Sequence, residues 1–98
     1  MSLPVSFRRA AQEEFNEAAA WYESKRALLG LEFVAEVERC VALASRQPRL
    51  YAEIHMDLRR VLTKRFPYGI YFRVEAQRIL VVAVLHSSRN PAIWQGRA

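Results

Sequence analysis

The spacing of apolar residues changes at Pro48, and this change constrains the fold more than any other feature of the sequence. Before Pro48, apolar side chains recur every three or four residues, which is the spacing of amphipathic helices. After Pro48, apolar and polar residues alternate over several short runs, which is the spacing of half-buried strands. The chain is therefore expected to be an α+β protein, with a helical half followed by a sheet half.

Two helices are predicted in the first half. The first covers residues 10–24, where Phe15 lies on an apolar face and glutamates lie on the other side. The second carries Phe33 on its apolar stripe and should end near Gln47, because the residue before a proline disfavours helical geometry. Two consecutive amphipathic helices joined by a short link usually form an antiparallel hairpin, which we expect here.

Short strands are predicted before and after the two helices in the sequence. The runs with strand character are residues 5–8, 59–66, 70–75 and 78–86. Residues 49–57 are expected to form an irregular connection, and residues 92–97 a short C-terminal helical turn. The predicted order is β-α-α-β-β-β: an N-terminal strand and a helical hairpin packed on a small, mostly antiparallel sheet, in one domain spanning residues 1–98.

Several side chains in and near the sheet have predicted positions. In the strand at 70–75, Ile70 and Phe72 should face the core, while Tyr71 and Arg73 should face the other, half-exposed side. Trp94 is expected to be a lid over the end of the sheet rather than a platform for stacking bases.

Basic and acidic residues are unevenly distributed along the chain. The 98 residues include 15 Lys and Arg against 10 Asp and Glu, a formal net charge of +5. Residues 1–48 hold six basic and seven acidic residues, net −1, whereas residues 49–98 hold nine and three, net +6. An anionic partner is therefore expected to bind the sheet half of the molecule.

Several functional classes are excluded by residues that the sequence lacks. Cys40 is the single cysteine and lies on the apolar stripe of the second predicted helix, so a buried, unreactive thiol is expected. His55 and His86 are not at ligand spacing, and no nucleotide-binding motif occurs, so neither a metal site nor a cofactor is predicted. The longest apolar run, Ile79–Leu85, has seven residues, too few to cross a membrane. A cytoplasmic location is expected.

The last three predicted strands carry residues that could support catalysis or binding. Cleavage of RNA through its 2′-hydroxyl needs a base, cations for the phosphate and an acid for the leaving oxygen. Tyrosines, His86 and many arginines are available for these tasks, but any basic domain of this size offers a similar set. The residues alone leave open whether His86 is a site residue or a polar strand end.

Pieces of sequence spread over nearly the whole chain carry a family resemblance. They are Trp21-Tyr22-Glu23, residues 29–33, residues 47–51, residues 59–61, residues 65–72, residues 82–86, residues 89–91, Trp94 and Arg97. In this order and spacing they resemble the ParE/RelE superfamily of type II toxin–antitoxin toxins, often called plasmid stabilisation proteins, and most of all its ParE-like branch.

This resemblance implies a growth-inhibiting toxin that a cognate antitoxin protein neutralises, with no cofactor. ParE-like toxins are taken to inhibit DNA gyrase by protein contact, without catalysis, and this is the expected function. The residues expected to contact the target or the antitoxin are Arg59, Arg60, Lys64, Arg65, Arg73, Arg89, Trp94 and Arg97. The antitoxin would bind through strand addition or through a helix in a groove.

Two alternatives remain open at this point. RelE-like members of the superfamily cut mRNA in the ribosome, and by that resemblance Arg65 would stabilise the phosphate, His86 would act as acid and Tyr71 would assist. Whether the chain is an enzyme is therefore undecided by the sequence. A second alternative is a protein that keeps the fold and binds an antitoxin but has lost toxicity. The assembly could be a homodimer or a toxin–antitoxin hetero-oligomer.

Overall fold

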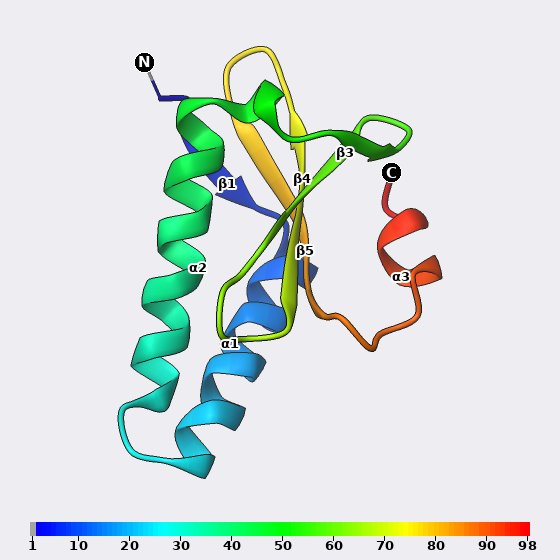
Figure 1. Ribbon diagram of the computed structural model, residues 1–98. Helices are drawn as coiled ribbons and strands as arrows, with labels where there is room; N and C mark the ends of the chain where they lie inside the picture. The colour runs from blue at the N-terminus through cyan, green and yellow to red at the C-terminus, as the bar shows by residue number, and fades with distance from the viewer. Residues whose placement is uncertain (1) are drawn as a thin grey trace.

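The computed structural model describes residues 2–98, and its order of elements confirms the predicted α+β fold (Figure 1). The first long helix and the end of the second lie within one residue of their predicted positions. The elements are β1 (Val5–Phe7), α1 (Arg9–Lys25), α2 (Leu29–Arg46), the short 3₁₀ helix η1 (Pro48–Leu50), β2 (Glu53–His55), β3 (Leu58–Leu62), β4 (Tyr68–Val74), β5 (Ile79–His86) and α3 (Ala92–Gln95).

The five strands form one mixed sheet in the order β1-β5-β4-β3-β2. Strand β1 is parallel to β5, and the other neighbours pair antiparallel. The hairpin of α1 and α2 covers one face, while α3 lies across the opposite side (Figure 1). Strand β5 is therefore buried on both faces from Ile79 to Leu85, as its continuous apolar sequence predicts.

Aromatic side chains fill the space between the helical hairpin and the sheet. Phe33 of α2 is fully buried and contacts Tyr22 of α1 at a ring-centroid distance of 5.1 Å. It also contacts Phe66 and Tyr68, which the sheet side supplies, at 5.3 and 5.0 Å. Aromatic contacts such as these, of which the two from Phe66 and Tyr68 are edge-on, bury large apolar areas and hold the hairpin on the sheet.

The turn between the helices is held by Glu23. Its carboxylate accepts the backbone N–H groups of Leu28 and Gly30, both at 2.9 Å, and so satisfies donors at the start of α2. Gly30 is required by close contact, because an added Cβ would lie 2.6 Å from the carbonyl oxygen of Ala19. The two helices are thus joined by a short and tightly packed turn.

The second face of the sheet is more buried than the alternation in β4 predicts. Tyr71 does face away from Ile70 and Phe72, but only 5% of it is exposed. The reason is that Trp94 of α3 stacks on the Tyr71 ring, with centroids 4.7 Å apart and planes 17° apart. The expected lid therefore exists, and it covers the middle of this face as well as its end.

The expectation of an irregular connection at residues 49–57 is wrong in part. This segment contains η1 and the edge strand β2, which pairs with β3 through a turn at Met56. Met56 adopts a left-handed φ of 53° without being glycine or asparagine. Since β2 has only three residues, too few to show a period, the sequence carries no clear strand signal there.

Candidate functional site

The predicted contact residues divide into exposed cations and cations used inside the fold. Arg60, Lys64 and Arg89 are exposed, and none of them forms an ion pair within residues 2–98. The Arg60 guanidinium lies 6.0 Å from the centre of the Tyr71 ring, over the face of the sheet that carries α3. These three side chains are free to meet an anionic partner.

Three other arginines are committed to internal contacts. Arg59 donates to the carbonyl oxygen of Tyr51 at 2.6 Å, and only 13% of its side chain is exposed. The Nε of Arg73 lies 3.0 Å from an Asp57 oxygen, although not in hydrogen-bond geometry. Arg97 binds both carboxylate oxygens of Glu14, at 3.0 and 2.8 Å. These charges stabilise the fold and are largely hidden from a partner.

Arg65 is exposed but paired. It follows β3 in the turn to β4, where it has a left-handed φ of 71°. Its guanidinium donates to Glu32 of α2 at 2.7 Å, and together with Arg26 it lowers the pKa of that carboxyl. The ion pair between Arg65 and Glu32 therefore holds the β3–β4 turn against α2.

The three residues expected to act together in a nuclease do not share a site. Tyr71 is buried beneath Trp94 on the face of α3, whereas His86 pairs with Tyr68 on the face of the helical hairpin. Arg65 lies in the β3–β4 turn and contacts Glu32. Since general acid–base catalysis needs its groups within hydrogen-bond reach of one substrate, this set cannot act as a unit in this conformation.

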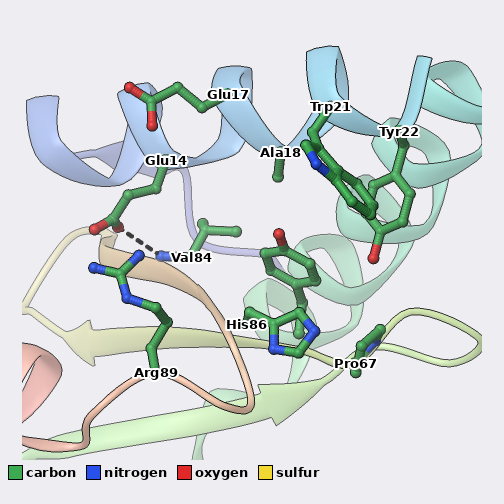
Figure 2. A pocket seen from close by; sticks show the side chains of 10 residues that line it. Glu14, Glu17, Ala18, Trp21, Tyr22, Pro67, Val84, His86 and Arg89 are labelled. Atoms are coloured by element: carbon green, nitrogen blue, oxygen red, sulfur yellow. Dashed lines mark hydrogen bonds between the residues drawn. The ribbon is translucent and has the colours of Figure 1, made fainter. Parts of the chain in front are cut away.

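An open pocket of about 510 Å³ lies between α1 and the end of β5, and His86 is one of its lining residues (Figure 2). Trp21 of α1 lies at one end of the pocket, and Glu14 reaches from α1 to the backbone N–H of Val84. The full lining comprises Glu14, Glu17, Ala18, Trp21, Tyr22, Pro67, Tyr68, Val84, His86 and Arg89.

Of these residues, sequence analysis offered His86, Arg89 and, among the tyrosines of the last strands, Tyr68 as site candidates. The side chains from α1 lie beside or on the apolar stripe of a helix, and this pattern is typical of a core face. The sequence signal that they share is weak: an aromatic pair, Trp21-Tyr22, beside glutamates on one helix. Only the fold brings this helix against the exposed end of β5.

Polar groups in the pocket are oriented by the backbone around them. The Nδ1 of His86 accepts the N–H of Ser88 at 3.0 Å, which leaves Nε2 as the nitrogen that can carry the proton in the neutral ring. Burial raises the pKa of the Tyr68 and Tyr22 hydroxyls, so both remain protonated at neutral pH. The pocket therefore offers aromatic surface and neutral hydroxyls, flanked by Glu17 and Arg89.

Other chemistry is absent from the part of the chain that the structure describes. Burial raises the pKa of the Cys40 thiol to about 11, and the side chain lies in the core, which agrees with the expected unreactive thiol. Within residues 2–98, no three His, Cys, Asp or Glu residues gather closely enough to hold a metal ion. Over the same residues, no helix has the length and apolar character needed to span a membrane.

Comparison with known proteins identifies the family. Residues 5–91 match the family model described as the ParE toxin of the type II toxin–antitoxin system parDE. The chain belongs to the ParE toxin family. Trp94 and Arg97 lie beyond the matched range.

A solved structure supports the fold independently. A chain of the chromosomal ParDE toxin–antitoxin system from P. aeruginosa is similar to this one with a TM-score of 0.75. The similarity covers 87% of this chain and 96% of that chain, at 16% sequence identity. Among curated proteins, no match was found. The ParE toxin family thus rests on the sequence match, and the similar structure confirms the architecture.

Proposed function

We propose that the chain is a growth-inhibiting toxin that acts in the cytoplasm by binding DNA gyrase, without catalysis of its own, and that a cognate antitoxin neutralises it. The family match over residues 5–91 supports the toxin part of this proposal. The gyrase target follows from the resemblance to ParE-like toxins, and the binding mechanism has support from the arrangement of the side chains.

The observation that carries the binding mechanism is the dispersal of the candidate catalytic groups. A ribonuclease of the RelE type would need a cation, an acid and a base around one phosphate. Here Tyr71 is covered by Trp94, His86 lies on the other face of the sheet, and Arg65 is paired with Glu32. An inhibitor that acts by contact needs only an exposed complementary surface, and the exposed cations of the sheet half support this mechanism.

The exposed cations of the sheet half include Arg60 over the face that carries α3, Lys64 in the β3–β4 turn and Arg89 beside the pocket at α1. These cations are exposed and carry no internal ion pair within residues 2–98, so their charges are available to a partner. Complementary charge raises association rates and suppresses wrong partners, which suits recognition of an acidic protein surface. An antitoxin with an acidic toxin-binding segment would meet the same cations.

The experiment is controlled expression of the chain in bacterial cells. We expect growth to stop, plasmid DNA to appear as linear or relaxed forms, and mRNA on ribosomes to remain intact. Cut mRNA with normal supercoiling would overturn the gyrase proposal and favour a ribonuclease of the RelE type. Unchanged growth would overturn toxicity itself and leave a protein that only retains the fold. The product of the adjacent reading frame should restore growth when co-expressed.

A pair of charge reversals tests the proposed surface. Arg60→Glu should weaken growth inhibition by about tenfold or more, because it removes a free cation from the sheet face. Arg8→Glu is the matched control, since Arg8 is also exposed but lies in the half of the chain with net charge −1. Equal effects of the two variants would contradict a binding surface on the sheet.

A further inference from the structure

Strand β1 forms one border of the sheet, and within residues 2–98 no strand lies on its outer side (Figure 1). All three of its residues are partly exposed, so water reaches this border. Residues 2–7 carry no charged side chain that would repel another chain. A strand edge of this kind presents N–H and C=O groups that can pair with a second strand.

The pairing of β1 with β5 shows which backbone groups face outward. The carbonyl oxygen of Pro4 and the N–H of Arg8 both bond to β5, each at 2.9 Å. Residues that bond to the same neighbour alternate along a strand, so Ser6, which lies between them, also bonds toward β5. Val5 and Phe7 therefore direct their N–H and C=O groups to the outer side. No other part of residues 2–98 bonds to these four groups.

The outer edge of β1 has definite ends. Before it, the N–H of Leu3 donates to the carbonyl oxygen of Ser45 at 3.0 Å, so α2 already occupies this position. After it, α1 begins at Arg9 and the chain leaves the sheet. The edge therefore offers four backbone groups to a partner, two from Val5 and two from Phe7.

These four groups are complementary to themselves in one register. At a bonded position of an antiparallel pair, the two residues that face each other exchange both of their hydrogen bonds. When Val5 of one copy faces Phe7 of a second copy, the reverse pair forms as well, and all four groups of each edge are satisfied. Ser6 then lies on the two-fold axis. This contact is closed, because both copies use the same surface.

An apolar groove lies directly beside this edge. It has a volume of about 550 Å³ and is open between β1 and the two long helices. Phe7 lines it and stacks on Phe15 of α1 with a centroid distance of 5.9 Å, while Val41 of α2 lines another wall. Glu38 is the one charged residue among those that line the groove. An acidic segment would meet this carboxylate and no cation, whereas a second copy of β1 brings only uncharged residues.

The opposite border of the sheet lacks these properties. Strand β2 carries the exposed Glu53, whose carboxylate lies 3.7 Å from the Arg59 guanidinium. Its register with β3 also shifts between Glu53 and His55. Charged side chains and irregular pairing both oppose the addition of another strand. Of the two borders, β1 is therefore the one suited to pairing.

We infer that two copies of the chain associate through β1, as a two-fold symmetric dimer in which the two five-stranded sheets become one continuous sheet. The antiparallel register places Val5 of each copy beside Phe7 of the other, on the face that the helical hairpins cover. The apolar row of one groove thus continues into the groove of the second copy. The inference uses only β1 and its groove and does not depend on the function proposed above.

Cysteine cross-linking tests the position of the axis. In this dimer Ser6 faces Ser6 of the second copy at a non-bonded position, where Cα atoms lie about 4.5 Å apart, a distance that a disulfide spans. Under mild oxidation, Ser6→Cys should form a covalent dimer. The control Ser88→Cys, exposed in the segment after β5, should remain monomeric. The native Cys40 is buried and present in both variants. Equal cross-linking of the two variants, or none in Ser6→Cys, overturns the inference.

Sedimentation equilibrium of the unmodified protein provides a second measurement. The wild-type chain should sediment at twice the mass of one chain as its concentration rises. Ser6→Lys should raise the dissociation constant of the dimer by about tenfold or more, because it places two ammonium groups side by side at the axis. Gln95→Lys, which adds the same charge at an exposed position of α3, should change it less than twofold.

Two results of this measurement contradict the inference. A wild-type chain that stays monomeric in the millimolar range shows that the edge does not pair. A dimer that Ser6→Lys and Gln95→Lys weaken equally shows that the copies meet elsewhere. Circular dichroism of each variant establishes that it is folded, and if Ser6→Lys does not fold, the cross-linking of Ser6→Cys decides.

Discussion

Glu36 stabilises the turn that follows β3 through several contacts from one carboxylate. It accepts two hydrogen bonds from Arg39, each 2.8 Å long, and it also accepts the backbone N–H of Lys64. The bonds from Arg39 are the largest cause of a low pKa, about 2 against an ordinary 4.5. Only 14% of the Glu36 side chain is exposed, so these bonds are partly shielded from water.

Glu36 should therefore make the protein sensitive to acid. Because its pKa is lower in the folded state, the stabilisation is complete above about pH 5 and is lost as pH falls from 4.5 toward 2. After allowance for screening by water, the contribution is about 1–2 kcal/mol at neutral pH. Glu36→Gln should lower the free energy of unfolding by this amount at pH 7 and by much less at pH 3. Denaturant melts at both pH values check this, and an equal loss at both would contradict it.

Leu28 adopts a backbone conformation that costs free energy. Its φ is 73°, in the left-handed region, and its side chain is 61% exposed, so packing compensates little of the strain. Leu28→Gly should therefore raise the free energy of unfolding by about 0.5–1 kcal/mol. Leu31→Gly is the matched control, because Leu31 is similarly exposed but helical, and it should lower stability by a similar amount. Thermal melts of both variants should shift in opposite directions; a decrease for Leu28→Gly would contradict the strain.

At the scale of elements, the contact between Glu14 and Arg97 ties the C-terminus to α1 and β5. The two residues are 83 positions apart in the chain and form a mostly shielded pair with two bonds. Removal of either partner leaves the other charge poorly solvated, so Glu14→Gln and Arg97→Gln should each cost about 1–3 kcal/mol. The double variant should cost less than the sum of the two single variants. Chemical denaturation of the wild type, the two single variants and the double variant gives the coupling free energy between Glu14 and Arg97. Strict additivity of the losses would show that the pair contributes nothing.

The elements differ in how well the sequence predicts them. Both long helices were predictable, because their apolar residues recur over four or more turns and Pro48 marks the end of the second. Strand β2 was not, since three residues cannot show a period and Met56 is not a usual turn residue. Burial of Tyr71 also escaped prediction, because it depends on Trp94, which is distant in sequence and stacks on it only in the folded chain.

For the whole molecule, the sequence predicts where the basic half lies but not which cations remain free. Arg60, Arg65 and Arg97 each add one positive charge to the net +6 of residues 49–98. The sequence does not show that two of them, Arg65 and Arg97, are paired in the fold. Their partners, Glu32 and Glu14, come from the helical half and meet them only through the tertiary fold. The pocket between α1 and β5 was hidden for the same reason, since one of its walls belongs to a helix whose residues have a core-like pattern.

The central claim is that this member of the ParE toxin family inhibits by binding gyrase and not by cutting RNA. The most direct measurement mixes the purified chain with purified gyrase, ATP and relaxed plasmid, and follows supercoiling on a gel. The account predicts that supercoiling falls as the chain is added, and that the Arg60→Glu variant is weaker than the Arg8→Glu control. Full supercoiling at a large excess of chain, with mRNA cleaved when the same chain is added to translating ribosomes, would contradict it.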